Sequence, residues 1–175
     1  MLEERIKKAI RNVPDFPKPG INFKDITPIL MDHQLSVDIA EGMVKQMHGW
    51  KIDAVVGVES RGFLFGMMVA TGLRVPFIPV RKAGKLPYET VSHAYELEYG
   101  QAEVEMHVDA VSLGMNVLVH DDLLATGGTA CAAAELIQKQ NATVAGFSFV
   151  VGLSFLNGEE PLKKYSDKLL TLVEY

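Results

Sequence analysis

Cysteine is nearly absent from this sequence of 175 residues, since Cys131 is its only one. A fold held together by disulfides is therefore excluded, and a lone thiol is typical of proteins kept in a reducing compartment. Long apolar segments are missing as well. The first ten residues alternate charged and apolar side chains, unlike a signal peptide. The longest uncharged run, which includes residues 141–158, is too short and too polar to span a membrane. We therefore expect a cytoplasmic protein without a membrane partner.

Positive charge is also in short supply. The 17 Lys and Arg residues are outnumbered by 22 Asp and Glu residues, and the net charge of −5 argues against nucleic acid as a partner, because such binding usually needs a basic surface. Two nucleotide-binding fingerprints are missing too: G-x-G-x-x-G does not occur, and no Lys follows the Gly pair as in a P-loop. The histidines are scattered without the spacing of metal ligands, so we expect no metal bound directly by the protein.

Hydrophobic residues make up 48% of the sequence, which excludes a disordered chain and suffices for a core. No internal repeat, linker or low-complexity tract interrupts it, so we expect one domain over residues 1–175. Short β-branched runs alternate with segments of helical spacing. The runs lie at residues 54–58, 76–80, 117–119 and 143–151, with an edge strand expected at 169–173. The helical segments lie at residues 2–12, 34–48, 62–71 and 129–140.

This alternation predicts the fold class. Continuous apolar runs are typical of strands buried on both faces of a parallel sheet, and the helices between them would cover those faces. We therefore expect an α/β fold with a central, mostly parallel sheet flanked by helices. Residues 90–108 depart from this order of strands and helices, because their side chains alternate as in a strand and no helical segment follows. They predict an antiparallel hairpin that projects from the sheet.

Three turns of this sequence follow predicted strands at the edge where a parallel sheet binds its ligands, beyond the carboxyl ends. They are ESRG at residues 59–62, RKAGK at residues 81–85 and DDLLATGGT at residues 121–129. The first two carry basic residues, whereas the third is acidic and then rich in glycine. We therefore expect the functional site at these turns.

The third turn has the parts of a phosphate site. Gly127 and Gly128 let successive backbone N–H groups point at one spot, and Thr126 and Thr129 add hydroxyl donors where the next helix begins. The positive end of that helix adds to the attraction for an anion. Together these groups predict a cradle for a phosphate monoester.

Asp121 and Asp122 precede this cradle at the end of the strand. Paired carboxylates beside a monophosphate suit two vicinal hydroxyls, as ribose 5-phosphate offers them. Each piece alone has a plainer explanation, since Gly-Gly before a helix is often only a turn and an Asp pair is often solvated. The whole string, VLVHDDLLATGGT at residues 117–129, resembles the phosphoribosyl-diphosphate signature of the type I phosphoribosyltransferases, and its LLATGGT form resembles the branch of that family that uses adenine.

Four further segments resemble this family, in the family's order. Residues 15–21 with 25–28 resemble its N-terminal hood, 59–63 its diphosphate loop, 81–87 the start of its mobile catalytic loop and 97–100 the distal part of that loop. The resemblance implies the type I phosphoribosyltransferase fold. It places a helix and hood at about residues 1–33 and a mobile hairpin at about residues 82–107.

The resemblance also implies a reaction: adenine joins the anomeric carbon of 5-phosphoribosyl 1-diphosphate, which releases diphosphate and forms AMP, in purine salvage. Departure of diphosphate leaves an oxocarbenium-like centre, so such an enzyme must hold the ribose still and stabilise a leaving polyanion. Mg²⁺ is the implied cofactor. Because Mg²⁺ is recruited mainly through substrate phosphates, no dedicated protein cage is expected. A homodimer is implied as well.

Two sets of binding residues follow from the resemblance. The ribose hydroxyls would meet Asp121 and Asp122, and the 5′-phosphate would meet Ala125, Thr126, Gly127, Gly128 and Thr129. The diphosphate would meet Glu59, Ser60, Arg61, Arg81, Lys82 and Lys85, with a cis peptide at Glu59–Ser60. Lys82 and Lys85 have an alternative interpretation as solvated surface charges.

Adenine would meet the segment Ile21, Asn22, Phe23 and Lys24, with Phe23 stacking on the base and the backbone reading its edge. The alternative is that Phe23 is simply a core residue. The catalytic set would be Arg81 with Glu98, which handles the proton on the purine, and Tyr99, which excludes water. The alternative for Glu98 and Tyr99 is an exposed strand pair.

The sequence departs from the family pattern at three positions. His120 replaces a β-branched aliphatic residue, and we expect it to pack beside its strand and bond a neighbour; the alternative is a catalytic role. Asn22 and Lys24 replace an aliphatic residue and an Arg. Two alternatives remain on the same fold: a regulator that binds phosphoribosyl diphosphate, which usually loses the catalytic loop, and a 6-oxopurine enzyme, which carries a different string after the acidic pair.

Overall fold

A seven-stranded sheet forms the centre of the computed structural model, which describes residues 1–96 and 100–175. The strand order is β5-β6-β4-β3-β7-β8-β9. Five neighbouring strands run parallel: β4 (Phe77–Lys82), β3 (Ala54–Val58), β7 (Asn116–Leu124), β8 (Thr143–Gly152) and β9 (Leu169–Glu174). At the other edge, β6 (Gln101–His107) pairs antiparallel with β4 and with β5 (Thr90–Glu96). The predicted α/β class and the projecting hairpin are confirmed.

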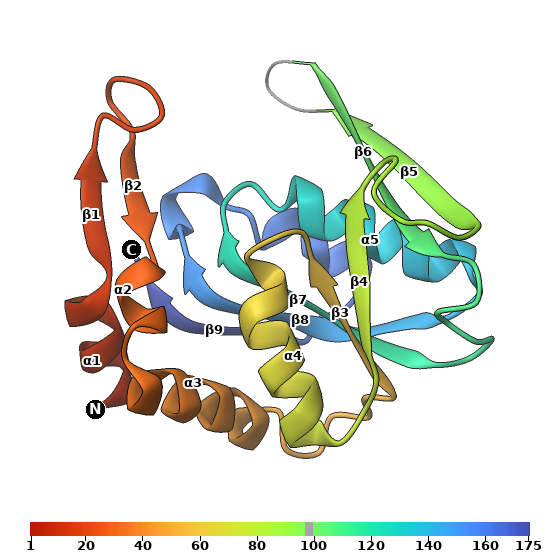
Figure 1. Cartoon of the computed structure of the whole chain (residues 1–175), viewed down its shortest axis with the longest axis horizontal. Coiled ribbons are helices and arrows are strands. Elements are labelled where there is room, and N and C mark those ends of the chain that lie inside the picture. Colours follow the sequence, from red (N-terminus) through yellow and green to blue (C-terminus); the bar gives the residue numbers. More distant parts are fainter. Residues whose placement is uncertain (97–99) are drawn as a thin grey trace.

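Helices cover both faces of this sheet. The helices α1 (Leu2–Ala9), α3 (His33–Gln46) and α4 (Gly62–Leu73) pack on one face, and α5 (Gly128–Lys139) packs on the other (Figure 1). Strand β7 shows why the strands form unbroken apolar runs. Val117 and Val119 belong to the cluster under α5, while Leu118 between them belongs to the cluster on the opposite face. Because successive side chains point to opposite faces and helices cover both faces, Val117, Leu118 and Val119 are all apolar.

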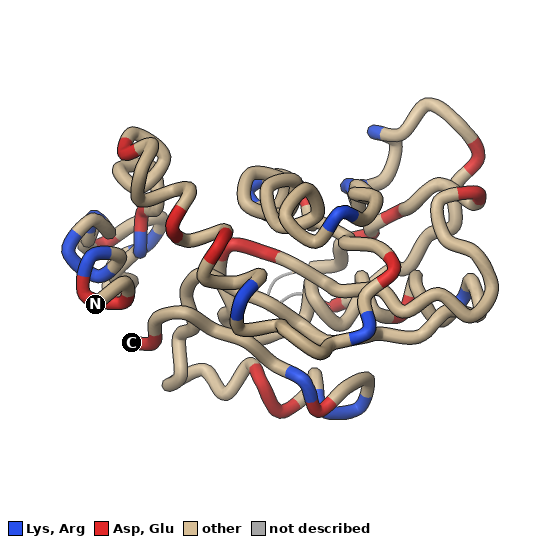
Figure 2. Tube along the Cα trace, turned by 90° about the horizontal axis from the view of Figure 1, so that it is seen from below, with Lys and Arg blue, Asp and Glu red and all other residues tan. Residues whose placement is uncertain are grey.

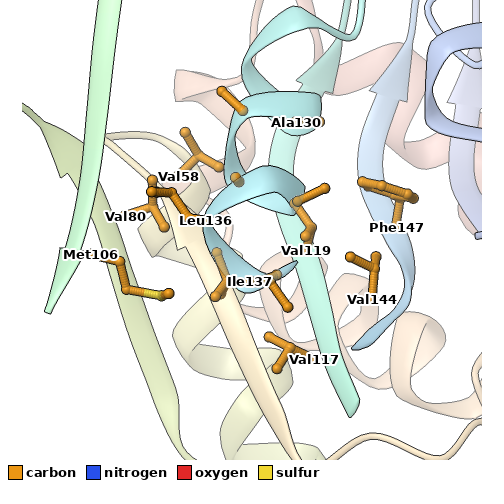
Figure 3. Close-up of a cluster of buried hydrophobic side chains, with 14 of the residues drawn as sticks. Val58, Val80, Met106, Val117, Val119, Ala130, Leu136, Ile137, Val144 and Phe147 are labelled. Carbon is orange, nitrogen blue, oxygen red and sulfur yellow. The ribbon is translucent and has the colours of Figure 1, made fainter. Parts of the chain in front are cut away.

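Helix α5 packs on the sheet through buried residues, most of which are small. Ala132, Ala133 and Ala134 are at most 1% exposed. From the same helix, Leu136 lies beside Val58 and Val80 in the core cluster (Figure 3). This packing determines where the first turn of α5 stands relative to the end of β7. The position of the glycine-rich turn therefore depends on the core.

The N-terminal hood is a small sheet of its own. Strands β1 (Arg11–Pro14) and β2 (Asn22–Asp25) pair antiparallel, and the short helix α2 (Thr27–Leu30) leads from β2 into α3. The Gly20 N–H donates to Asp15 Oδ1 at 2.7 Å and closes the turn between the strands. In Figure 1 the hood and the β5–β6 hairpin stand on either side of the edge to which the carboxyl ends of β4 and β7 point.

The predicted helix over residues 2–12 is wrong beyond Ala9. Arg11 and Asn12 lie opposite Asp25 and Lys24 in the hood, so their backbone groups pair with β2 instead of continuing the helix. Two 3-10 helices between β8 and β9, Ser154–Leu156 and Glu160–Lys164, were not predicted. Within residues 1–96 and 100–175, no helix has the length and apolar character needed to cross a membrane.

Candidate functional site

The glycine-rich turn joins the end of β7 to the start of α5. A cavity of about 80 Å³ opens on it, and the residues that line this cavity include Asp121, Ala125, Thr126, Gly127, Gly128 and Thr129. The first N–H groups of a helix have no partner within the helix and are free to bind an anion. The structure therefore brings together every residue that was predicted to hold the 5′-phosphate.

A segment distant in sequence supports this turn from behind. Gly127 has φ of +84°, and a Cβ there would overlap the carbonyl oxygen of Gly158. A Cβ on Gly158 would in turn overlap the carbonyl oxygen of Ala125. Both positions require glycine, because two stretches of backbone touch there. Sequence analysis missed Gly158, since the pair Asn157-Gly158 predicts a turn but not the neighbour of that turn.

The acidic pair lies beside the cradle and is largely withdrawn from solvent. Asp122 is 2% exposed, and its backbone N–H donates to Asp121 Oδ1 at 2.8 Å. Burial raises the pKa of Asp121 well above its usual value, and the neighbouring charge of Asp122 raises it further. Burial also raises the pKa of Asp122, although the Arg61 guanidinium opposes this. Hydroxyl donors or a cation placed here would stabilise the two carboxylates.

Arg61 connects three of the predicted segments. It lies in the turn after β3, where the Glu59–Ser60 peptide is cis as the resemblance implied. Its Nε stands 3.1 Å from Asp122 Oδ2, and its guanidinium carbon stands 5.3 Å from the centroid of the Phe23 ring, within cation–π range. The turn after β3, the acidic pair and the hood therefore meet at this side chain.

Phe23 is half-buried and belongs to neither of the two buried hydrophobic clusters. Its ring packs edge-on against Phe16 with the centroids 5.2 Å apart. Of the other predicted adenine-binding residues, Ile21 and Asn22 are exposed. Lys24 contacts two other residues: its Nζ donates to Asn12 Oδ1 at 2.6 Å and lies 3.9 Å from the centroid of the Tyr175 ring.

Glu59 ties the two basic turns together. Its carboxylate accepts from Arg81 Nε at 3.2 Å, from Arg81 Nη2 at 3.3 Å and from the Lys82 N–H at 2.9 Å. Arg81 also donates through Nη1 to the Lys85 carbonyl at 3.3 Å. Burial raises the pKa of Glu59, but the bonds from Lys82 and Arg81 outweigh it and the pKa is lowered. Lys82 and Lys85 are exposed, and Glu98 and Tyr99 lie outside the described residues.

A buried carboxylate that sequence analysis missed holds the second basic turn. Glu105 is 6% exposed, and its Oε1 accepts the backbone N–H groups of Gly84, Lys85 and Leu86 at 3.1, 3.2 and 3.1 Å. Its Oε2 accepts from Thr90 Oγ1 at 3.3 Å. Burial raises the pKa of Glu105, but these hydrogen bonds outweigh burial and the pKa is lowered. The sequence signal for it is slight: one Glu between two apolar residues.

We expect Glu105→Gln to lower the free energy of unfolding by about 1–3 kcal/mol, because the amide oxygen lacks the negative charge that strengthens the three N–H bonds. The matched control is Glu103→Gln on the same strand, an exposed residue that bonds Ser92, with an expected effect below about 0.5 kcal/mol. Because the folded-state pKa of Glu105 is lowered from 4.5, its stabilisation is present above pH 4.5 and is lost as the pH falls through the lowered value. Urea titrations at neutral and acidic pH measure both effects; equal losses for the two variants would contradict this role.

His120 occupies the centre of β7 as a neutral residue. It is buried, its Nδ1 lies 2.9 Å from Ser148 Oγ on β8, and burial lowers its pKa to about 3. This is the packing that sequence analysis expected.

In the part of the chain that the structure describes, no group of three or more His, Cys, Asp or Glu residues is placed to hold a metal ion. Figure 2 shows acidic and basic residues interspersed along the trace rather than one basic face.

Comparison with known proteins identifies relatives over the whole length of the chain. The family described as phosphoribosyl transferase domain matches residues 29–173. The adenine phosphoribosyltransferase of Nitrosococcus oceani is 51% identical over 172 residues, which cover 98% of this chain and 99% of that protein. The enzyme of the same name from Cytophaga hutchinsonii is 48% identical over 100% of this chain and 97% of its own. A crystal structure of adenine phosphoribosyltransferase from Thermoanaerobacter pseudethanolicus has a TM-score of 0.95 and 47% identity, with 100% of both chains covered.

Proposed function

Because this chain belongs to the phosphoribosyl transferase domain family, we propose that it is an adenine phosphoribosyltransferase. It transfers the phosphoribosyl group of 5-phosphoribosyl 1-diphosphate to adenine and releases AMP and diphosphate, a reaction of purine salvage. The observation that carries the proposal is its similarity, at 47% to 51% identity over nearly the whole chain, to proteins of that name. The meeting of the acidic pair, the diphosphate loop and the hood at Arg61 supports it.

The ribose 5-phosphate is held at two points. The cradle from Ala125 to Thr129 receives the 5′-phosphate, and Asp121 and Asp122 accept hydrogen bonds from the 2′ and 3′ hydroxyls. Since hydrogen bonds to a carboxylate favour its charged form, the sugar relieves the cost of burying this pair. A ribose held at both ends presents its anomeric carbon in one orientation, which lowers the entropic part of the barrier.

The basic residues act on the leaving group. As the bond between the anomeric carbon and oxygen breaks, its electron pair goes to diphosphate and the ring becomes oxocarbenium-like. Arg61, Arg81, Lys82 and Lys85 supply the positive charge that stabilises the departing anion. Glu59 contributes by position, because its carboxylate holds Arg81 and the Lys82 amide. Ser60, in the same loop, binds the diphosphate in this proposal.

The hood supplies the base site. Phe23 stacks on adenine, and the backbone of Ile21, Asn22, Phe23 and Lys24 reads its edge. Phe23 is suited to this because its ring is only half-buried and belongs to neither core cluster. In this proposal Glu98 handles the purine proton and Tyr99 shields the reacting centre from water, as in the related family.

Mg²⁺ is the proposed cofactor, and the acidic pair fits it, because two buried carboxylates gain from a nearby cation. Since no larger ligand group occurs among the described residues, the ion would be held mainly through substrate oxygens. When bound, it neutralises charge on the diphosphate.

On the family resemblance we further propose a cytoplasmic homodimer in which residues 1–175 form one domain, with a hood at about 1–33 and a mobile hairpin at about 82–107. Light scattering after gel filtration tests the dimer.

The reaction is tested by incubating the protein with 5-phosphoribosyl 1-diphosphate, Mg²⁺ and one purine base at a time, and separating the nucleotides formed. We expect AMP from adenine and no nucleotide from hypoxanthine, guanine or xanthine. Nucleotide from a 6-oxopurine instead would assign the protein to that group of enzymes. Binding of phosphoribosyl diphosphate without turnover of any base would assign it to the regulators.

A further inference from the structure

The hairpin strand β5 lies along helix α5 and contacts both of its ends. At the last turn of α5, Lys139 Nζ donates to the Ser92 carbonyl at 2.6 Å. At the first turn, Tyr95 Oη lies 3.3 Å from Thr129 Oγ1. The Tyr95 ring packs against the hydrophobic cluster under α5, and its Cδ2 comes within 3.9 Å of the Cβ position of Gly128. The phenol hydroxyl is therefore held at the edge of the phosphate cradle.

The contact between Tyr95 and Thr129 affects the direction in which the Thr129 hydroxyl proton points. A threonine hydroxyl carries one proton and two lone pairs, so it can donate to one partner while it accepts from another. If Thr129 donated to Tyr95, it would turn a lone pair toward the phosphate and repel it. If Tyr95 donates to Thr129, the Thr129 proton is free to point at the phosphate. An anion in the cradle selects the second arrangement.

Resting on the proposed function, we propose that Tyr95 is a positioning residue for the 5′-phosphate. Its O–H donates to Thr129 Oγ1 and thereby directs the Thr129 proton at the phosphate oxygens. Donors linked in series polarise one another, which strengthens the bond to the anion. The same hydrogen bond connects the hairpin, which leads to the predicted catalytic residues, with the cradle. Sequence analysis assigned no role to Tyr95.

Tyr95→Phe tests this role, because it removes the hydroxyl and keeps the packed ring. We expect the Kd for AMP, measured by calorimetry, and the KM for 5-phosphoribosyl 1-diphosphate to rise about three- to tenfold, the usual range for one hydrogen bond. The KM for adenine and kcat should change less than about twofold. Tyr88→Phe is the matched control, since Tyr88 is 59% exposed and packs on His107, and it should leave all four values unchanged.

A double-mutant cycle separates positioning from packing. Thr129→Val removes the hydroxyl through which Tyr95 acts, so adding Tyr95→Phe to it should change the Kd for AMP by less than about twofold. An unchanged Kd in Tyr95→Phe alone, or the same loss with and without Thr129→Val, would overturn the inference. Wild-type protein that binds AMP but makes none from adenine would overturn the proposed function instead, and the AMP titrations would still decide the role of Tyr95.

Discussion

Gly127→Ala is expected to lower kcat/KM for 5-phosphoribosyl 1-diphosphate by about 100-fold, since displacing a bound group by roughly 1 Å costs that much. Two causes act together. The residue has φ of +84°, which disfavours any side chain, and the added methyl would overlap the Gly158 carbonyl oxygen. That oxygen belongs to backbone and cannot rotate away. The turn must move, and its N–H groups move with it. Steady-state kinetics at saturating adenine measures the loss.

The neighbouring glycine provides the comparison for this prediction. A Cβ at Gly128 would come no closer than 3.9 Å to Thr126 Oγ1 and Tyr95 Cδ2, which is ordinary contact. Gly128→Ala should therefore lose far less activity than Gly127→Ala, although the two positions are adjacent. Gly158→Ala, which is distant in sequence, should resemble Gly127→Ala because it would overlap the Ala125 carbonyl. Equal losses for Gly127→Ala and Gly128→Ala would show that the overlap with Gly158 is not the cause.

Asp121→Asn is expected to disable the enzyme and stabilise the fold at the same time. Loss of a charged acceptor for a ribose hydroxyl should lower kcat/KM by about 10- to 150-fold, the equivalent of about 1.5–3 kcal/mol. Burial and the charge of Asp122 raise the pKa of Asp121, so its ionised form destabilises the folded protein. Asn keeps the oxygen that accepts the Asp122 N–H and removes the buried charge. A gain of about 1 kcal/mol would raise the Tm by about 2–4 °C.

The stability gain should depend on pH in one direction. A group whose pKa is higher in the folded state stabilises that state while protonated, and this stabilisation is lost as the pH rises through the raised value. The Tm advantage of Asp121→Asn should therefore be greatest at neutral pH and should vanish near or below pH 3.8, the ordinary value for Asp. Calorimetric scans across this range check it, with the exposed Asp109→Asn as control. A lower Tm for Asp121→Asn than for wild type at pH 7 would contradict the prediction.

Several features could be predicted because they depend on neighbours in the chain. The apolar run of β7, the turn after it and the first turn of α5 are contiguous, so residues 117–129 specify both the strand and the cradle. The unbroken β-branched strands likewise predict a parallel sheet covered on both faces. Helical spacing was misleading in residues 2–12, because pairing of Arg11 and Asn12 with β2 outweighed a local preference.

Other parts of the site depend on the order and register of the strands. Arg61 was predicted as a ligand of diphosphate, but its positions against Asp122 and over Phe23 require β3, β7 and the hood to meet. Glu105 reaches the basic turn because β6 pairs with β4 so that Glu105 lies opposite Arg81. A buried Glu in an alternating strand does not reveal which backbone N–H groups it will accept.

The sequence by itself determined the fold class and the chemical parts of the site, because periodicity, turn residues and a helix start are local properties of the chain. The tertiary structure decided which distant residues complete those parts. Gly158 behind the cradle, Glu105 at the basic turn and Tyr95 beside Thr129 all arrive from other elements. The physical reason is that such contacts depend on how helices pack on the sheet and how strands align. These are properties of the whole core, which no short segment encodes.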